Sequence, residues 1–213
     1  MKDQVRISYN TIAERYAQTR KQFSKSNNFH LELLNTYLKS GSTVLDLGCG
    51  SGFPVSAFFA NKGHKVIGLD ISEKQIELAK SNVPDGQFEV GDIETLHESA
   101  FKVDAVLAFY SIFHISRDKH AEIITRIASF LSPGGMLLIT MGAAEWEGND
   151  NFLGVKMFWS HWGQERNTAI VLRAGFKIII NVIDHSGEEE HQVILAQLKS
   201  IQLTRKPMIF SKQ

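Results

Sequence analysis

The sequence has a single cysteine, Cys49, among its 213 residues. One cysteine cannot form a disulfide bond within the chain, which is typical of proteins from reducing compartments. The sequence also lacks any apolar run of roughly 18 residues, the length that a membrane-spanning helix requires, and its first ten residues lack the apolar segment of a secretory signal. These absences predict a cytoplasmic protein that does not associate with membranes.

An excess of charge of either sign is also absent. Lysine and arginine together number 23, and so do aspartate and glutamate. A balanced chain creates no general field that attracts nucleic acid or an anionic membrane, so we expect neither as a partner. No pair of cysteines and no His-x-x-x-His spacing indicates a metal site, so we expect no metal. The composition leaves a monomer and a homodimer equally open.

Repeats, low-complexity blocks and flexible linkers are missing as well, so we expect one domain over residues 1–200 and a tail at 201–213. What is present is an alternation of short runs rich in valine, isoleucine and leucine with segments of helical periodicity. The expected strands are 43–47, 65–69, 86–90, 103–109 and 135–141. The expected helices are 53–62, 73–82, 118–131 and about 163–173. This alternation predicts a parallel sheet that is covered by helices on both faces.

The two ends of the chain add further elements. Helical patterns at 2–20 and 28–39 predict an N-terminal cap over residues 1–40. The runs FKIIINVIDHS and EEEHQVILAQLK predict an antiparallel hairpin that completes a seven-stranded, mostly parallel sheet. Segment 142–162 holds all three tryptophans but no periodicity, so we expect a long loop that covers a small-molecule pocket, with simple packing against the core as the alternative.

The stretch VLDLGCGSGFP, residues 44–54, places Gly48, Gly50 and Gly52 directly after the first strand. Glycines at the carboxyl end of a strand let a ligand approach the backbone, although they can also serve only the geometry of a tight turn. Asp70 ends the second strand about 20 residues later, where an acid can bind the hydroxyls of a ribose. The sequence therefore predicts a ligand that carries a nucleoside.

A nicotinamide dinucleotide fits that pattern only in part. Its fingerprint, G-x-G-x-x-G, needs a third glycine where this chain has Phe53. Asp46 also precedes the first glycine by two residues and would lie awkwardly close to a pyrophosphate. A carboxylate at that position is better placed to face a cationic amino group.

The glycine turn resembles the first motif of class I S-adenosylmethionine-dependent methyltransferases of the small-molecule type. VIGLDIS, GDIETL, DAVLAFYSIFHI and LSPGGMLLIT resemble the later motifs of that family, in order, between residue 43 and about residue 141. SYNTIAERYAQTR is similar to the family helix Y-D-x-x-A-x-x-Y-x-x-x-R, which covers the cofactor, except that Asn10 replaces the aspartate. The resemblance implies a three-layer α/β Rossmann-like sandwich, an enzyme, S-adenosyl-L-methionine as cofactor and S-adenosyl-L-homocysteine as product.

The resemblance also implies which residues bind the cofactor. Asp46 and the glycine turn would hold the methionine portion, Asp70 the ribose and Asp92 the adenine amino group; helix capping is the alternative for Asp70 and Asp92. Cys49 is expected to pack between the glycines rather than to act as a nucleophile. The complete cofactor set is Tyr16, Asp46, Gly48, Cys49, Gly50, Gly52, Asp70, Ile71, Asp92, Ile93, Ala108 and Phe109.

Methyl transfer from a sulfonium is an in-line displacement that needs mainly alignment and exclusion of water. A general base is needed only if the acceptor must first lose a proton, and His114 and His161 are the candidates. Alternatively, Ser160 caps the following helix and His161 is an ordinary residue of its first turn. The residues expected around the acceptor are Tyr9, Tyr110, Phe113, Trp146, Phe158, Trp159 and Trp162. The predicted function is methyl transfer to an oxygen, nitrogen or sulfur atom of a small molecule; a non-catalytic cofactor-binding module and, less favoured, a nicotinamide-dependent oxidoreductase are the alternatives.

Overall fold

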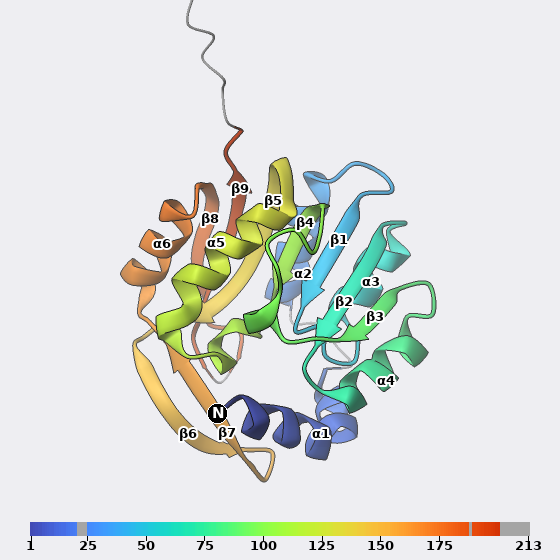
Figure 1. Ribbon diagram of the computed structural model, residues 1–213, viewed down its shortest axis with the longest axis vertical. Coiled ribbons are helices and arrows are strands. Elements are labelled where there is room, and N and C mark those ends of the chain that lie inside the picture. Colours follow the sequence, from blue (N-terminus) through green and yellow to red (C-terminus); the bar gives the residue numbers. More distant parts are fainter. Residues whose placement is uncertain (21–24, 188, 201–213) are drawn as a thin grey trace, which may run out of the picture.

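The computed structural model describes residues 1–20, 25–187 and 189–200, so the expected tail at 201–213 lies outside the described residues (Figure 1). A seven-stranded sheet in the order β3-β2-β1-β4-β5-β9-β8 forms the centre of the molecule. Its strands are β1 (Thr43–Leu47), β2 (Lys65–Asp70), β3 (Gln87–Val90), β4 (Val103–Ala108), β5 (Leu131–Gly142), β8 (Phe176–Asp184) and β9 (His191–Leu198). The predicted mostly parallel α/β sheet with a late antiparallel hairpin is confirmed.

The order of the strands reverses between β1 and β4, because the chain runs outward to β2 and β3 before it returns to β4. β1 pairs in parallel with both β2 and β4, and only β9 runs antiparallel to its neighbours β5 and β8. In doubly wound sheets a ligand binds outside the carboxyl ends of the strands at this reversal. The topology therefore places the glycine turn after β1 at the edge of a crevice.

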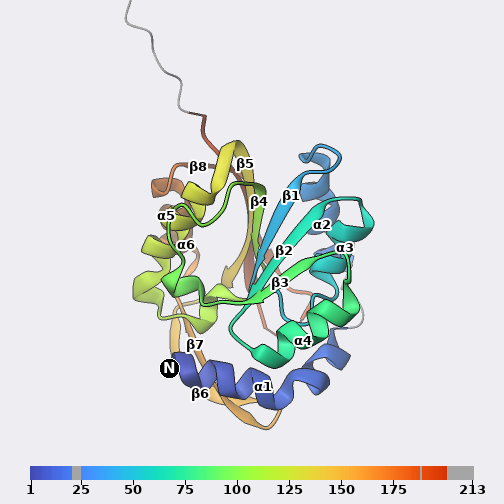
Figure 2. The ribbon, with the colours of Figure 1, turned by 45° about the vertical axis from the view of Figure 1, so that its right-hand side comes forward.

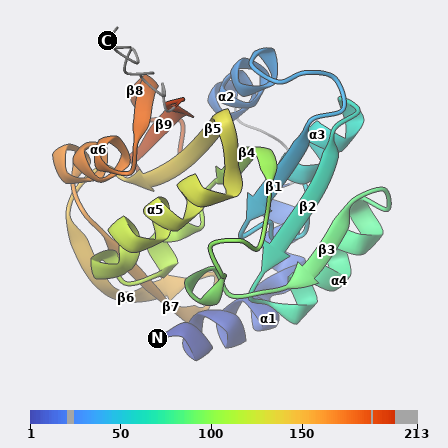
Figure 3. The ribbon, with the colours of Figure 1, turned by 45° about the horizontal axis from the view of Figure 1, so that its top comes forward.

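Helices cover both faces of the sheet and give the predicted three layers (Figure 3). Apolar residues of α2 (Lys25–Thr36), α3 (Val55–Asn61) and α4 (Glu73–Asn82) pack on one face. Those of α5 (His120–Phe130) and α6 (Gln164–Arg173) pack on the other face. Short 3-10 turns, η1 (Ile93–Thr95), η2 (Ile112–His114) and η3 (Arg117–Lys119), connect the elements next to β4. None of the described helices is both long and apolar enough to cross a bilayer.

The helix α1 (Lys2–Thr19) runs across the carboxyl-end edge of the sheet, next to α4 and β7 (Figure 2). Four buried side chains, Val5, Ile12, Met157 and Phe158, form a small apolar cluster between α1 and β7. This third cluster is separate from the two clusters that line the faces of the sheet. The N-terminal helix is thus attached to the domain by its own small core.

The expected loop at 142–162 is wrong. The segment forms a second, two-stranded antiparallel sheet of β6 (Trp146–Phe152) and β7 (Val155–His161). Leu153 and Gly154 join the strands with φ angles of 50° and 81°, as in the two-residue turns that suit the twist of a hairpin. β6 is polar and largely exposed, so it carries no apolar alternation that would reveal a strand.

Ser160 lies inside β7, and α6 begins after Gly163, so the alternative in which Ser160 caps a helix is also wrong. The Ser160 hydroxyl accepts a hydrogen bond from the Arg117 backbone N–H at 2.7 Å and donates one to Glu147 at 2.6 Å. It therefore ties the hairpin to the turn η3. The stretch DIS at 70–72 predicts an N-cap at Ser72. The structure confirms it, because the Ser72 hydroxyl accepts from the Gln75 backbone N–H.

Candidate active site

A cavity that is partly open to solvent lies between α1 and the carboxyl ends of β1, β2 and β4. Its walls come from both sides of the strand reversal and from the N-terminal helix. Most of the predicted cofactor residues line it, together with some of those predicted for the acceptor and for catalysis. The predicted residues in its walls are Tyr9, Tyr16, Asp46, Gly48, Cys49, Gly50, Asp70, Ile71, Asp92, Ile93, Phe109, Tyr110 and His114.

The glycine turn meets the cavity with bare backbone. Gly48 and Gly50 have φ angles of 77° and 54°, a region that side-chain-bearing residues rarely adopt. A Cβ at Gly48 would also overlap the Cβ of Ser111, whose hydroxyl donates to the Leu47 carbonyl at 2.6 Å. Gly52 does not line the cavity; a Cβ there would press against α4 at Ala79 and Val83. Two of the three glycines thus shape the ligand side of the turn, and the third allows α4 to pack.

Asp46 is a carboxyl group in the wall of the cavity and only 2% exposed. The Ser56 hydroxyl donates to its Oδ2 at 2.7 Å, and no described cation forms an ion pair with it. Burial raises the pKa of Asp46 to about 7, because the charged form loses its hydration. A cationic ligand group beside Asp46 would supply the missing positive charge.

Asp70 ends β2 and connects two backbone segments. Its Oδ2 accepts from the Gly50 N–H and its Oδ1 from the Ser72 N–H, each at 2.9 Å. Burial raises the pKa of Asp70 to about 6, although both backbone hydrogen bonds act in the opposite direction. A carboxylate oxygen can accept more than one hydrogen bond, so Asp70 can fix the turn and still bind hydroxyl groups of a ligand.

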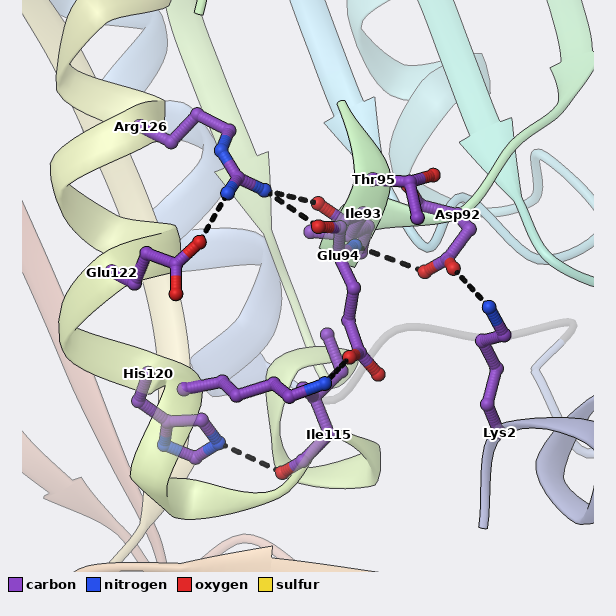
Figure 4. A network of polar contacts seen from close by, with 10 residues as sticks. Lys2, Asp92, Ile93, Glu94, Thr95, Ile115, His120, Glu122 and Arg126 are labelled. Carbon is purple, nitrogen blue, oxygen red and sulfur yellow. Dashed lines mark hydrogen bonds and ion pairs between the residues drawn. The ribbon is translucent and has the colours of Figure 1, made fainter. Parts of the chain in front are cut away.

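Asp92 lies at the other end of the cavity, within a polar network around η1 (Figure 4). Its Oδ1 caps η1 by accepting from the Glu94 N–H at 2.9 Å, and its Oδ2 pairs with the Lys2 ammonium of α1 at 2.8 Å. From α5, the Arg126 guanidinium donates to the Glu94 carbonyl at 2.8 Å. Helix capping, the alternative role of Asp92, therefore accounts for one carboxylate oxygen, while the other oxygen pairs with Lys2 of α1.

His114 and Tyr9 form a hydrogen-bonded pair in the cavity wall. The His114 Nδ1 lies 2.9 Å from the Phe158 carbonyl oxygen, which can only accept, so Nδ1 carries the proton. In the neutral ring, Nε2 then accepts from the Tyr9 hydroxyl at 2.8 Å. Burial lowers the pKa of His114 to about 4 and raises the pKa of Tyr9 well above its usual value. Both nitrogens of His114 are therefore occupied by protein groups.

The second predicted base, His161, lies outside the cavity, where its Nδ1 bonds to the Ala144 carbonyl. Ala108 is buried in β4 behind the cavity wall. Trp159 packs behind His114, with 4.4 Å between ring centroids, and Phe113 packs against Trp159. The remaining aromatic residues predicted for the acceptor, which also do not line the cavity, are Trp146, Phe158 and Trp162. The aromatic hairpin thus supports the cavity wall from behind rather than forming its surface.

Cys49 lines the cavity through its backbone turn, and burial raises the pKa of its thiol well above the usual value. A thiol that stays protonated is a poor nucleophile, which agrees with the predicted packing role. Among the described residues, no cluster of three histidine, cysteine, aspartate or glutamate side chains could hold a metal ion.

Arg20, the arginine that ends the stretch SYNTIAERYAQTR, also lines the cavity. Its guanidinium carbon lies 5.1 Å from the ring centroids of both Tyr16 and Tyr110, and its Nε donates to the Tyr16 hydroxyl at 3.1 Å. No described carboxylate forms an ion pair with it. Tyr110 reaches this position with a φ of 60°. An unpaired guanidinium in a cavity can bind an anionic ligand group.

Sequence reasoning missed Lys2 and Ser111, which also line the cavity. Lys2 is an ordinary lysine near the start of a helix, and only its contact with Asp92, 90 residues away, makes it part of the site. Ser111 follows β4 by three residues and is placed by the turn after Tyr110. No sequence pattern marks Lys2, and Ser111 lies within the quoted stretch DAVLAFYSIFHI without being singled out by it.

The sequence profile described as "Methyltransferase domain" matches residues 44–135. A trans-aconitate 2-methyltransferase from Variovorax paradoxus is 33% identical over 106 residues, which cover 49% of this chain and 40% of that protein. The chain spans about half or less of the length of the curated relatives that it matches.

Solved structures give a broader match at lower identity. A Burkholderia thailandensis 1,6-didemethyltoxoflavin-N1-methyltransferase is 17% identical, with a TM-score of 0.72 over 92% of this chain and 87% of that one. A [4+2]-cyclase is 16% identical, with a TM-score of 0.71 over 94% and 97% of the two chains. Residues 44–135 are therefore similar to a methyltransferase domain, and most of the chain shares the fold of these solved structures.

Proposed function

We propose that this chain binds S-adenosyl-L-methionine in the cavity after β1 and transfers its methyl group to a small-molecule acceptor. The observation that carries the proposal is the set of groups around one cavity. The carboxyl groups of Asp46, Asp70 and Asp92, a bare glycine turn and an unpaired guanidinium line it together. This set matches a ligand that bears an ammonium group, ribose hydroxyls, an adenine amino group and a carboxylate.

Each part of the cofactor has a chemically suitable partner. Asp46 would hold the ammonium group, since it is buried without a described cation. Asp70 would take the ribose hydroxyls, and Asp92 would accept from the adenine amino group between Ile71 and Ile93. Arg20 would bind the carboxylate. Gly48 and Gly50 let the ligand lie against backbone, where a Cβ would intrude.

When bound, the cofactor supplies an electrophilic methyl group on a positively charged sulfur. The chain then has to align the acceptor with that methyl group and exclude water, which can contribute roughly 7–11 kcal/mol. α1 covers the cavity with Tyr9 and Tyr16, whose rings lie 5.3 Å apart, centroid to centroid. Aromatic faces also suit a cationic centre, with contributions of about 0.5–2 kcal/mol.

The acceptor is proposed to be a small molecule with an oxygen, nitrogen or sulfur nucleophile. The relatives named above are a trans-aconitate 2-methyltransferase and a didemethyltoxoflavin N1-methyltransferase. Neither nitrogen of His114 is free, and its low pKa makes it a weak base. We therefore favour an acceptor that needs no deprotonation in the site, such as a carboxylate, a thiolate or a neutral amine.

A reaction other than methyl transfer is the second candidate, because the fold does not determine the chemistry. The similarity to a [4+2]-cyclase at a TM-score of 0.71 shows that this fold occurs in a protein named for another reaction. A nicotinamide cofactor has less support, since Phe53 lines the cavity where the dinucleotide fingerprint has a glycine. We further propose that residues 1–200 act as a single cytoplasmic domain, monomeric or homodimeric, without nucleic acid or membrane partners.

Calorimetry with S-adenosyl-L-homocysteine and with NADH tests the cofactor, and a turnover assay for released S-adenosyl-L-homocysteine tests the reaction. Asp70→Ala is expected to weaken S-adenosyl-L-homocysteine at least about tenfold, because charge-assisted hydrogen bonds contribute about 1.5–3 kcal/mol each. Asp104→Ala is the control, since Asp104 also accepts from a backbone N–H, that of Thr43, but lies outside the cavity. Equal affinity in folded Asp70→Ala would remove this residue from the site, and binding of NADH alone would overturn the proposal.

A further inference from the structure

Asn10, which stands where the related family helix has aspartate, connects α1 to the start of α4. Its Oδ1 accepts from the Ser72 hydroxyl at 2.7 Å and from the Lys74 backbone N–H at 3.1 Å. Its Nδ2 donates to Glu73 Oε2 at 2.5 Å, and Arg6 donates to Glu73 Oε1 at 2.8 Å. The amide thus acts as a second cap of α4, contributed by another helix.

The orientation of this amide follows from its partners. The Lys74 N–H can only donate, so it must face the amide oxygen, and the Glu73 carboxylate can only accept, so it must face the amide nitrogen. Asn10 lowers the pKa of Glu73 to about 2 by that donated bond, with smaller contributions from the Glu73 backbone and Arg6. An aspartate at position 10 could still accept both bonds from α4, but it would place a second carboxylate against Glu73.

The contacts of Asn10 continue into the cavity wall. The Ser72 hydroxyl that donates to Asn10 belongs to a residue that is 0% exposed, and the Ser72 N–H donates to Asp70 Oδ1. Asp70 Oδ2 in turn holds the Gly50 N–H of the glycine turn. On α1, the residue that precedes Asn10 is Tyr9, which lines the same cavity and binds His114. Through Ser72, hydrogen bonds therefore connect α1, which forms one wall of the cavity, to Asp70, which lies in the opposite wall.

We propose that Asn10 is a positioning residue that fixes α1 against the Asp70 wall of the cavity, and that an amide is required there because it donates to Glu73 while it accepts from the N-terminus of α4. The effect on the cofactor rests on the proposed function. The attachment of α1 to α4 does not rest on the proposed function, because it consists of contacts between protein groups alone.

The test compares Asn10→Asp with the double variant Asn10→Asp/Glu73→Gln. Asn10→Asp is isosteric and keeps both accepted bonds, so it removes only the donor and adds the second carboxylate. We expect amide hydrogen exchange in α1 of the ligand-free protein to accelerate about tenfold, and the Kd for S-adenosyl-L-homocysteine to rise about fivefold. In the double variant, the glutamine amide on α4 can donate to the new carboxylate on α1, and we expect both quantities to return to within about twofold of wild type.

Glu73→Gln alone is the matched control, because the introduced glutamine still offers an oxygen to the Asn10 amide. It is expected to change either quantity less than about twofold, since exposed ion pairs such as that with Arg6 contribute little. Unchanged exchange in Asn10→Asp, or a loss that the double variant does not restore, overturns the proposal. If wild type binds no S-adenosyl-L-homocysteine, the proposed function fails, while the exchange data still decide the role of Asn10.

Discussion

A buried carboxyl group without a cation, as Asp46 is, links ligand affinity to pH. Its pKa of about 7 in the ligand-free protein means that it is largely protonated at pH 6 and largely ionised at pH 8. Only the ionised form attracts an ammonium group. We therefore expect the affinity for S-adenosyl-L-homocysteine, measured by calorimetry, to fall at least about tenfold between pH 8 and pH 6.

Asp46→Asn separates this effect from other titrations. Asparagine keeps an oxygen for the Ser56 hydroxyl but cannot ionise. The variant should bind more weakly at pH 8, and its affinity should change only about twofold over the same range, as the pKa of about 6 at Asp70 requires. A flat profile in wild type would contradict the placement of Asp46 beside a cation.

Gln75 is a fully buried glutamine of α4 whose side-chain oxygen and nitrogen both have no hydrogen-bond partner among the described residues. Burial of unpaired polar groups costs about 1–3 kcal/mol. Gln75→Met keeps the length of the side chain and removes both polar atoms, so the Tm of the ligand-free protein should rise by about 2–4 °C.

Gln192 is the matched control for Gln75, because it is equally buried but fully paired. Its Nε2 bonds to Thr168 and Asn181, and its Oε1 accepts from Asn167. Gln192→Met should therefore lower the Tm. A lower Tm in Gln75→Met as well would show that Gln75 has a partner, such as a buried water, that stabilises the fold.

Among the elements, the turn between β1 and α3 depends strongly on the absence of a side chain at Gly48. At Gly48 the positive φ combines with the overlap that a Cβ would make with Ser111. Gly41 has a nearly equal φ of 74°, but a Cβ there would meet no atom within 4 Å. Gly48→Ala should therefore lower the free energy of unfolding by more than Gly41→Ala, whose cost is the backbone strain of about 1–2 kcal/mol alone.

Chemical denaturation of the two variants measures this difference, and S-adenosyl-L-homocysteine binding should be lost only in Gly48→Ala. Equal stability of the two variants would mean that the turn yields to the added Cβ by moving Ser111. Binding that survives in Gly48→Ala would show that close approach of the ligand to this backbone is not needed.

Elements whose signals are local could be predicted from the sequence. The apolar run of β1, the glycines after it and the cap at Ser72 each depend on neighbouring residues, and the structure confirms these elements. The hairpin β6–β7 could not be predicted, because β6 is polar and exposed and the buried side chains that pack on α1 come from β7. Its stability comes from a contact with the opposite end of the chain.

The same distinction holds for the site. The positions of Asp46 and Asp70 in the cavity wall could be predicted because both residues lie at the carboxyl ends of strands in a doubly wound sheet, and that of Asp92 followed from the resemblance of GDIETL to a family motif. The partners of those groups could not. Lys2 meets Asp92 across 90 residues and Tyr9 meets His114 across 105 residues, and both contacts depend on where α1 docks. The aromatic composition of segment 142–162 also suggested that Trp159 lines the pocket. Instead, its ring packs against the ring of His114 and lies outside the cavity.

For the whole molecule, the division of the core into separate clusters predicts unequal stability. The clusters on the two faces of the sheet hold the strands, whereas the smaller cluster of Val5, Ile12, Met157 and Phe158 packs α1 on the hairpin, next to hydrogen bonds such as that from the Ser8 hydroxyl to the Lys156 carbonyl. A small cluster of this kind can open without unfolding the rest. We therefore expect α1 and β6–β7 to open together as one unit that is less stable than the sheet.

Met157→Ala tests this division by native-state hydrogen exchange. Met157 is fully buried, and its truncation costs about 2–5 kcal/mol, so amides of α1 and β6–β7 should exchange at least about thirtyfold faster while those of β4 and β5 change little. Met136→Ala, an equally buried methionine of β5, should instead accelerate the amides of the sheet. If Met157→Ala accelerates β4 and β5 as much as α1, the molecule unfolds as a single unit. In that case α1 could not move off the cavity while the sheet stays folded, and a ligand would have to enter past a fixed helix.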